Sequence, residues 1–449
     1  MFDRMMRAAL DAYYFFKVGS CSYKELYKLM ELQNADKKRL NNFLKNKICE
    51  LVKHAYHSVP FYREIYEKLG VDIGKFKRVE DLRKLPIVNK SMLRQAFPDR
   101  TVAVDYRSRA VYDKTSGSMG EPFEFFIDRY AAPLMQASYM LFNTWMGVGA
   151  HDRHVQIASP KPHTLKRILL NRTYGKTKIS TLDIKRVNMR SIVERINRIN
   201  PKYIEGYSAS LANTARLVED IGLELRCRPK AVIATSEDLT ESYRKQIEEV
   251  FHSKVFNRYG SREFSGAVAQ ECNICKGLHV NTALCHLELV DEDSEQVGEG
   301  ERGRILITDL NNKVMPFIRY DIGDSAIRGP ERSECGRSLP LIDGLRGKEG
   351  LFIVSKTGEK TAFETVSSHL FQKYASQVYM YQFVQERRGE LSLKIVATEK
   401  FDESVIEEMY AYLEETLVDF SLSIEVVDDI PPTETGKKPF IITLPDSRP

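Results

Sequence analysis

Short apolar segments alternate with amphipathic segments through the middle of the chain, and this alternation constrains the fold more than any other feature. The apolar segments, which favour β-strands, are residues 202–207, 230–235 and 254–260. The segments around them, with apolar residues at helical spacing, are residues 191–200, 209–222 and 241–251. Strands separated by helices of this length are typical of parallel crossover units. The pattern therefore predicts an α/β domain.

The flanking segments extend this domain in both directions. Residues 22–70 are charged and periodic, which predicts helices interrupted at Pro60. Residues 101–160 continue the α/β pattern, with expected strands at TVAVDY, FEFFID and HVQIAS and a helix from about Ala131. After residue 280, short strands with Gly and Asp turns predict a β-rich subdomain.

A turn-rich, charged segment, GLRGKEG at 344–350, marks the predicted domain boundary. The residues after it follow the order β-α-β-β-α-β. We therefore expect an α/β fold in which residues 1–345 form a large N-terminal domain of mixed α/β layers plus the β-rich subdomain. Residues 346–449 would form a small, mobile α+β C-terminal domain. A chain of 449 residues suits two domains, because single cores rarely grow beyond about 250–300 residues.

Charge and hydropathy exclude several classes of protein. Sixty-seven basic and 62 acidic side chains leave a net charge of +5, which suits anionic ligands such as nucleotides and does not argue for nucleic acid. No apolar run approaches the roughly 20 residues that span a bilayer. Seven scattered cysteines predict a reducing cytoplasm without a disulfide framework. The oligomeric state stays open.

The first 20 residues do not have the pattern of a signal peptide, because Asp3 and Arg4 stand at the start and no small-residue cleavage site follows. Arg4, Arg7 and Lys17 beside the aromatic residues 13–16 would suit an amphipathic helix at a membrane surface. A helix packed on its own domain is the favoured interpretation. Peripheral attachment to a membrane therefore stays open beside a cytoplasmic location.

A loop rich in hydroxyl groups and glycine, KTSGSMGE, stands directly before the expected strand FEFFID. Gly117 and Gly120 let backbone N–H groups turn inward, and Thr115, Ser116 and Ser118 add hydroxyl donors, so that the loop could bind phosphate oxygens. Its spacing is not that of a Walker loop. Taken alone, a solvated hairpin loop is the more ordinary interpretation.

Three further motifs follow this loop in a fixed order: FNRYGSREFSG, FIRYDIGDSA and IPPTETGKKPFII. Together the four resemble the ordered core motifs of the adenylate-forming superfamily, which includes acyl-CoA synthetases, peptide-synthetase adenylation domains and luciferases. The segments AYHSVPFYREIYEKLG, LRKLPIVNKSML and CGRSLPLIDGLRG point to its phenylacetate-CoA ligase-like branch, and most closely to capsular-polysaccharide biosynthesis members. The resemblance spans about residues 50–440.

The resemblance implies ATP and Mg²⁺ as cofactors. The TSGSMG-like loop would hold the β- and γ-phosphates, although Glu121 stands where a lysine often follows the glycine, so basic groups must come from elsewhere. Attack of a carboxylate on the α-phosphate gives an acyl-AMP and pyrophosphate, and the charge that gathers there needs a metal ion and a cation. The resemblance implies two catalytic residues. Glu263 would bind Mg²⁺, and Lys437 would supply the cation.

The resemblance also implies where the nucleoside lies. Asp324 would accept the ribose hydroxyls, and Tyr259 would stack on the adenine. The nucleotide-binding residues that it implies are Ser236, Glu237 and the adjacent Asp238, Tyr259, Gly260, Ser261, Asp324 and, at a hinge on which the C-terminal domain swings, Lys348. For Ser236 and Tyr259 a purely structural role is about as well supported. At the hinge Arg346 is the alternative to Lys348, and Gly350 falls near the usual acidic position.

Ordinary structural roles compete with these assignments. Glu263 could pair with Arg258 or Arg262, and Lys437 could be a surface charge beside its competitor Lys438. Asp324 could cap a turn. The order of the motifs favours the functional interpretation of Glu263, Asp324 and Lys437.

Four residues form a separate pattern that is typical of structural zinc: Cys272, Cys275, His279 and Cys335. Some members of the branch that the chain resembles carry zinc here. Plain buried thiols explain the pattern equally well. Cys285 and His286 are alternative ligands.

Other functions have weaker support. EGYSASL resembles the nucleophile elbow of a serine hydrolase only superficially, because Ser210 stands where the final Gly is required. A Cys/His transferase lacks an identifiable base. A catalytically inactive scaffold of a polysaccharide assembly complex is the third rival, against which the retained Glu263, Asp324 and Lys437 argue.

The substrate is less constrained than the reaction. A small-molecule carboxylic acid would be activated and passed to coenzyme A, or to an amine in an amide ligase that joins an amino acid and a sugar acid. The variable loop at 159–167 offers Lys161, His163 and Lys166 to an anionic substrate.

Overall fold

The structure is a computed structural model of the 449-residue chain. It describes residues 12, 21–115, 123–149, 151–158, 171, 175–264, 266–347, 352–363, 366–367, 370, 373–374, 377–417, 419–433 and 436–442.

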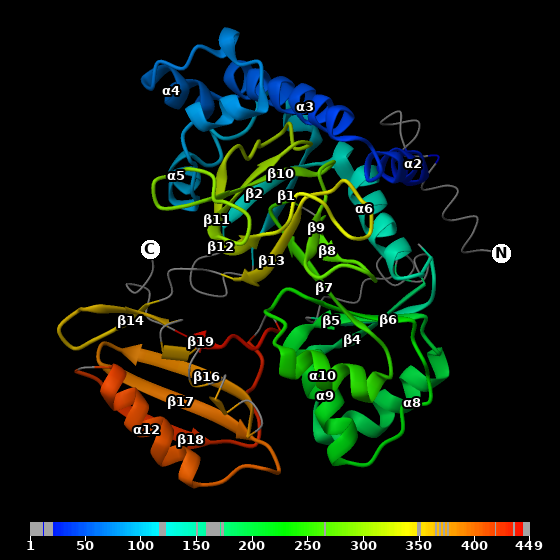
Figure 1. The fold of residues 1–449 in the computed structure, drawn as a ribbon, viewed down its shortest axis with the longest axis vertical. Helices are drawn as coiled ribbons and strands as arrows, with labels where there is room; N and C mark the ends of the chain where they lie inside the picture. Colours follow the sequence, from blue (N-terminus) through cyan, green and yellow to red (C-terminus); the bar gives the residue numbers. More distant parts are fainter. Residues whose placement is uncertain are drawn as a thin grey trace.

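The described chain from residue 21 onward begins with three helices, in the upper part of Figure 1: α2 (Ser22–Leu32), α3 (Lys37–Ser58) and α4 (Pro60–Lys68). The Asp36 carboxylate caps α3 by accepting a hydrogen bond from the Arg39 backbone N–H at 2.7 Å. Pro60 opens α4, where its missing N–H costs nothing. The predicted interruption at Pro60 is confirmed.

A connecting region of short elements leads from α4 into the sheet. These elements are η1 (Ile73–Lys75), η2 (Val79–Lys84), α5 (Lys90–Ala96), η3 (Val104–Arg109) and the hairpin of β1 (Ala110–Lys114) with β2 (Glu124–Asp128). The strand expected at TVAVDY is wrong, because this segment runs into η3. Its Val102 and Ala103 are buried, and Ala103 donates its N–H to the Val314 carbonyl at 2.8 Å, so these two residues pack outside a sheet.

An 11-stranded sheet runs through the large N-terminal part in the order β10-β11-β12-β13-β9-β8-β7-β6-β5-β3-β4. In chain order its strands are β3 (His154–Ala158), β4 (Lys176–Ser180), β5 (Tyr203–Tyr207), β6 (Ala231–Thr235), β7 (Val255–Ser261), β8 (Gly266–Glu271), β9 (Leu278–Val280), β10 (Cys285–Val290), β11 (Arg302–Asp309), β12 (Tyr320–Arg328) and β13 (Leu341–Arg346). The strands from β4 to β7 are parallel, and the others pair antiparallel. The predicted α/β class is confirmed, and the β-rich part joins the parallel part where β8 turns back on β7.

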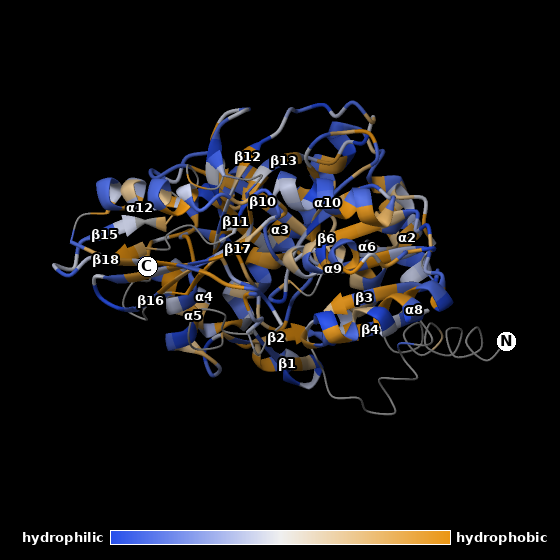
Figure 2. Ribbon diagram, turned by 90° about the horizontal axis from the view of Figure 1, so that it is seen from below, coloured by the Kyte–Doolittle hydropathy of each residue, from blue (hydrophilic) through white to orange (hydrophobic). Residues whose placement is uncertain are grey.

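Helices cover the parallel part of this sheet. They are α6 (Ala132–Trp145), α8 (Met189–Ile199), α9 (Ser208–Asp220) and α10 (Glu241–Phe251), with the short η4 (Arg129–Ala131), η5 (Thr181–Asp183) and η6 (Arg186–Asn188). The apolar side of α8, with Ile192, Val193 and Ile196, packs into the core between helices and strands. Figure 2 shows the apolar colour concentrated in the strands of the central sheet, while polar colour dominates the outer helix surfaces.

The C-terminal residues form smaller sheets of their own, at the lower left of Figure 1. Strands β14 (Phe352–Val354) and β15 (Lys360–Ala362) make a hairpin. A four-stranded sheet has the order β18-β17-β16-β19, from β16 (Val378–Arg387), β17 (Glu390–Ala397), β18 (Ser421–Val426) and β19 (Ile441–Ile442), with α12 (Ser404–Thr416) beside it. The strands and the second helix that the sequence predicts here are confirmed.

The C-terminal sheet packs against α9 and α10 of the N-terminal part. Tyr379, Met380 and Ile430 are almost completely buried in the same core that contains residues of those two helices. The guanidinium of Arg216 lies 5.0 Å from the centre of the Tyr379 ring, a cation–π distance. This contact holds the motif near the C-terminus beside the C-terminal ends of the parallel strands.

Among the helices that the structure describes, none is long and apolar enough to cross a bilayer.

Candidate active site

Strand β7 carries the motif FNRYGSRE to the edge of the parallel sheet and then turns into β8. The two strands pair antiparallel with an irregularity between Tyr259 and Gly260. A Cβ atom on Gly260 would lie 2.8 Å from the Gly266 carbonyl oxygen, so only glycine lets the strands approach this closely. The tight turn leaves Tyr259 and Glu263, which stand on either side of Gly260 in the motif, close to the other predicted site residues.

Tyr259 and Asp324 meet although 65 positions separate them. The Tyr259 hydroxyl donates a hydrogen bond to Asp324 Oδ2 at 2.7 Å. Burial and the neighbouring Asp324 carboxylate raise the pKa of Tyr259 well above its usual value, so the phenol stays a neutral donor. The Asp324 carboxylate, oriented by the Tyr259 phenol, suits a ribose, and the Tyr259 ring suits a base. These two roles stay predictions.

Glu263 is buried at 4% exposure and has two neighbours for its carboxylate. The Ser261 hydroxyl donates to one oxygen, and the Lys90 ammonium lies 3.3 Å from the other. Arg258 instead approaches Glu205, at 3.4 Å, and Arg262 pairs with Asp113. The structural interpretation that pairs Glu263 with either arginine is therefore wrong.

Lys90 is a candidate site residue that the sequence analysis missed. Its ammonium lies 5.8 Å from the centre of the Phe123 ring, directly after the hydroxyl-rich loop, as well as beside Glu263. Because that loop has an acidic residue in place of the usual lysine, a cation from elsewhere was expected, and its contact with Phe123 makes Lys90 a candidate for this role. The local sequence PIVNKSM carries no signal for this role, since its partner is 173 residues away in the sequence.

The segment before Lys90 is held by the motif FIRYDIGD. The Val88 N–H donates to the Arg319 carbonyl at 3.0 Å, and the Asp321 N–H donates to the Val88 carbonyl at 2.8 Å. The Arg319 side chain, buried at 3% exposure, donates to the Leu85 carbonyl at 2.9 Å and pairs with the buried Glu288 at 3.2 Å. One motif thus supplies Asp324 and also fixes the segment that delivers Lys90.

Thr115 closes the base of the hydroxyl-rich loop. Its hydroxyl accepts a hydrogen bond from the Phe123 N–H at 3.0 Å, and its own N–H donates to the Phe123 carbonyl at 2.9 Å. Several predicted residues lie outside the described residues: Ser116, Gly117, Ser118, Gly120, Glu121, the hinge residues Lys348 and Gly350, Thr435 and the loop at 159–167.

Lys437 reaches from the C-terminal part of the chain to the turn after β6. Its ammonium donates to the Ser236 carbonyl at 3.3 Å, across 201 positions. Ser236 has a φ of 69°, a left-handed conformation that is unfavourable for a non-glycine residue. Such strain persists where the surrounding structure enforces it, often at functional sites.

The carboxylate of Glu237 joins the two parts of the chain. It accepts hydrogen bonds from the Ala209 N–H at the start of α9 and from the Lys438 N–H, both at 3.0 Å. Burial raises the pKa of Glu237 despite these donors. The Lys438 ammonium is itself buried and pairs with Asp429 at 2.6 Å. Of the two adjacent lysines, Lys437 therefore has the ammonium that faces the predicted site.

The predicted hinge, at Gly347, lies close to the carboxylates of Asp238 and Asp324. The Gly347 N–H donates to Asp238 Oδ1 at 3.3 Å. A Cβ atom on Gly347 would lie 3.5 Å from Asp238 Oδ1 and 4.0 Å from Asp324 Oδ1. Asp238, Asp324 and the end of β13 thus lie together. A movement at Gly347 would therefore displace groups at the expected ribose site.

The four predicted zinc ligands also converge. The ligand atoms of Cys272, Cys275, His279 and Cys335 all lie within 4.8 Å of one another. The Cys335 sulfur lies 3.3 Å from His279 Nε2, and the Cys335 N–H lies 3.3 Å from the Cys275 sulfur. The cluster that the structure brings together contains neither of the alternatives, Cys285 and His286.

This donor set fits Zn²⁺. Three thiolate sulfurs and one imidazole nitrogen are a common structural zinc set, and their spacing suits a tetrahedral ion at about 2.0–2.3 Å from each. Burial lowers the pKa of His279 to about 4, so the ring is neutral and able to bind a metal at neutral pH. The cluster lies between β8 and the loop before β13, where a bound ion would tie these segments together.

Two rival functions lose support from the positions of their residues. Ser208, which would be the nucleophile of EGYSASL, is fully buried and donates its hydroxyl to the Glu237 carbonyl at 3.0 Å. Cys272 and Cys275 are buried in the metal-type cluster.

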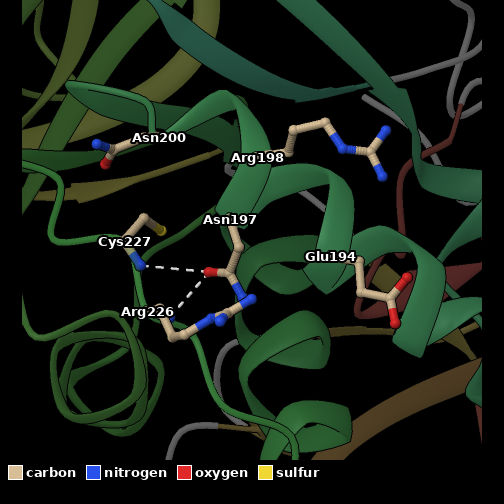
Figure 3. Close-up of a pocket in the computed structure, with 6 residues that line it drawn as sticks. All are labelled: Glu194, Asn197, Arg198, Asn200, Arg226 and Cys227. Atoms are coloured by element: carbon tan, nitrogen blue, oxygen red, sulfur yellow. Dashed lines mark hydrogen bonds between the residues drawn. The ribbon is translucent and has the colours of Figure 1, made fainter.

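A cavity of about 470 Å³ lies elsewhere, at the C-terminal end of α8. Figure 3 shows the residues that line it, which are Glu194, Asn197, Arg198, Asn200, Arg226 and Cys227. Asn197 Oδ1 accepts hydrogen bonds from the backbone N–H groups of Arg226 and Cys227, at 2.8 and 3.2 Å, which fixes the loop against the helix. None of the predicted active-site residues lines this cavity.

Comparisons with known proteins agree with this arrangement. Residues 353–443 match the family model of the CapK C-terminal domain. A phenylacetate-coenzyme A ligase of Thermus thermophilus is 25% identical over 404 residues, which cover 84% of this chain and 86% of that protein. Protein CapK of Staphylococcus aureus is 25% identical over 437 residues, covering 93% and 90%.

Among solved structures, 2-hydroxyisobutyryl-CoA ligase in complex with 2-HIB-AMP has a TM-score of 0.72 at 19% identity, covering 92% of this chain and 91% of that one. The fold is therefore shared over nearly the whole length. The predicted resemblance to phenylacetate-CoA ligases and their CapK-type relatives is confirmed, and so is the predicted fold class with its separate C-terminal sheet.

Proposed function

We propose that this chain, whose relatives are named ligases, is an ATP-dependent adenylate-forming ligase that activates a carboxylic acid as an acyl-AMP. The acid's oxygen attacks the α-phosphorus of ATP, the bond to the β-phosphate breaks, and pyrophosphate leaves. An acceptor then attacks the acyl carbon and releases AMP. The observation that carries this proposal is the hydrogen bond from the Lys437 ammonium to the Ser236 carbonyl. Ser236 stands two positions before Asp238, which accepts the Gly347 N–H close to Asp324.

The residues divide the work by chemistry. Asp324 and Tyr259 would hold the ribose and the base. Lys90 would meet phosphate charge near the hydroxyl-rich loop, and Lys437 would place its charge on the oxygens around the α-phosphorus, where the transition state gathers negative charge.

The Glu263 carboxylate fits Mg²⁺, which prefers oxygen ligands. Mg²⁺, when bound, would neutralise part of the charge of the phosphates. The Lys90 ammonium lies 3.3 Å from this carboxylate, so Lys90 and the metal would meet the charge of the same phosphates.

The acceptor divides the proposal into two forms. Coenzyme A is named for the phenylacetate-CoA ligase relative and for 2-hydroxyisobutyryl-CoA ligase. The second form is an amide ligase of surface-polysaccharide synthesis with an amine acceptor, which the capsule-type resemblance of the sequence suggests; residues 353–443 match the CapK C-terminal domain. In either form we propose a cytoplasmic location.

Exchange of labelled pyrophosphate into ATP tests the first half-reaction. A panel of aryl, short aliphatic and sugar carboxylic acids should contain at least one that stimulates exchange in the presence of Mg²⁺. Exchange without any acid, or none with any acid while the protein binds ATP, would contradict the proposal.

The second half-reaction is tested with enzyme that carries its acyl-AMP. Rapid acyl-CoA formation on addition of coenzyme A supports the thioester form. Inert coenzyme A together with amine-stimulated AMP release supports the amide form.

A further inference from the structure

One segment of the chain concentrates positive charge. Residues 176–202 carry eight basic and two acidic side chains, a net charge of +6, whereas the whole chain has only +5. The remaining residues therefore sum to −1. A local excess of this size creates a positive potential over one part of the surface.

The fold displays this charge on one side. The segment contains the edge strand β4, the short η5 and η6, and α8. Helix α8 buries its apolar face and turns Arg190, Arg195 and Arg198 to solvent, while Lys185 and Arg186 are exposed just before it. Figures 1 and 2 both place α8 on the side of the molecule away from the C-terminal sheet.

In the part of the chain that the structure describes, no carboxylate forms an ion pair with the exposed basic residues of the segment, which are Lys185, Arg186, Arg190, Arg195, Arg198 and Lys202. Their mutual repulsion makes an anionic partner favourable.

Apolar side chains project from the same place. Val187 is 87% exposed, more than any other large apolar residue among those described, and Leu182 is 39% exposed. Val187 directly follows Lys185 and Arg186, and Arg190 comes three positions after it. An exposed apolar tip surrounded by cations is the arrangement that peripheral proteins use at a bilayer surface, where the tip enters the headgroup region and the cations meet anionic lipid.

We propose that residues 182–190 together with Arg195 and Arg198, the α8 surface, dock this protein on a membrane that contains anionic phospholipid. The proposal does not depend on the chemistry proposed above. Docking through α8 would leave the C-terminal sheet on the opposite side, free to move.

Other anionic partners fit the α8 surface less well. A single-stranded nucleic acid would be expected to stack on aromatic side chains among the cations, and the α8 surface has none. A single small anion would need convergent cations, yet Figure 3 shows the Arg198 side chain extending away from Arg226 at the neighbouring cavity.

Co-sedimentation with vesicles tests the proposal on the full chain. One set of vesicles contains phosphatidylcholine alone, and the other contains about one third phosphatidylglycerol. Each cation near an anionic surface contributes about fivefold in affinity. The Arg186→Glu/Arg190→Glu variant should therefore bind the anionic vesicles at least tenfold more weakly than the wild type.

A matched control carries the same change of net charge elsewhere. Lys75 and Lys245 are exposed on η1 and α10, and Lys75→Glu/Lys245→Glu should weaken binding by no more than about twofold. Val187→Ser should weaken binding severalfold even in about 0.5 M salt, where screening removes most of the electrostatic attraction. Acid-dependent pyrophosphate exchange and thermal unfolding should match the wild type in every variant.

Four results would overturn the proposal. These are equal binding to both kinds of vesicle, equal loss in the α8 variant and its control, binding to duplex DNA but not to anionic vesicles, and loss of binding only on deletion of residues 1–20. The last result would assign membrane attachment to the N-terminal segment instead.

Discussion

At the scale of single residues, the site combines motif residues that are recognisable in the sequence with partners that are not. The motif order predicted Tyr259, Glu263, Asp324 and Lys437, and the structure brings Tyr259 to Asp324 and Lys437 to the turn at Ser236. Lys90 could not be predicted, because its importance rests on contacts with residues far away in the sequence. A lysine in PIVNKSM looks like any surface charge until Glu263 is seen beside it.

Lys437→Ala should lower acid-dependent pyrophosphate exchange by about 10²–10³-fold, because one preorganised cation at the reacting phosphate is lost. Binding of ATP and thermal unfolding should change little. Lys400→Ala, which removes an exposed lysine of the same C-terminal part, is the control and should exchange like the wild type. Unchanged exchange in Lys437→Ala would remove this lysine from the account.

Lys90→Met should raise the KM for Mg-ATP and lower exchange by roughly tenfold or more, because it removes a cation from the phosphate region while keeping most of the length of the side chain. Steady-state exchange at varied ATP measures both effects. Lys75→Met changes an 84% exposed lysine and serves as the control. A KM equal to that of the wild type would show that Lys90 only balances the charge of Glu263.

The buried carboxyl group of Asp309 should make the stability of the protein depend on pH. Burial raises its pKa to about 7, while its Oδ1 accepts a hydrogen bond from the Asn311 N–H at 2.9 Å. The folded pKa lies above the unfolded value of about 4. The stability from this group is therefore fully present below pH 4 and is lost as the pH rises toward 7.

Asp309→Asn keeps the acceptor and cannot ionise. Its free energy of unfolding, relative to the wild type, should rise by roughly 2–3 kcal/mol between pH 5 and pH 7 and then level off. Urea unfolding across that range measures the difference. The exposed Asp105→Asn should show no such trend, and a flat difference for Asp309→Asn would mean that Asp309 is already ionised at pH 5.

At the scale of elements, the strength of the local pattern decided what the sequence could predict. Strands β5, β6 and β7 are apolar or β-branched, and each was predicted close to its place. Strand β4, with the sequence KTKIS, was missed because it is polar and lies at the edge of the sheet, where one side needs no apolar partner. Residues 101–106 looked like a strand, but only Val102 and Ala103 of their apolar residues are buried, and Val104 is exposed where η3 begins.

The cysteine cluster is an element-scale prediction that the structure makes testable. Protein purified without added metal should contain about one zinc per chain by elemental analysis, and a strong chelator should lower the midpoint of thermal unfolding. Cys275→Ser should lose most of the metal, whereas Cys227→Ser, at a buried thiol outside the cluster, should keep it. Less than about 0.2 zinc per chain in a folded protein would favour plain buried thiols.

At the scale of the whole molecule, the C-terminal part brings residues to the candidate site of the N-terminal part. Glu237 accepts the Lys438 N–H, Lys437 reaches Ser236, and Tyr379 packs against Arg216. The sequence predicted two domains and the catalytic lysine, yet it could not show that Glu237 is shared between α9 and the C-terminal loop. That contact depends on how two separately folded sheets meet, which no local pattern encodes.

The most direct test of the central claim follows the oxygen atoms of the acid. A substrate acid identified by pyrophosphate exchange is labelled with ¹⁸O in its carboxylate and turned over with ATP and the acceptor. If the carboxylate attacks the α-phosphorus, one labelled oxygen stays on the phosphate when the acyl group leaves, and mass spectrometry should find AMP with one ¹⁸O atom and unlabelled pyrophosphate. Unlabelled AMP, or ADP together with labelled orthophosphate, would contradict adenylation.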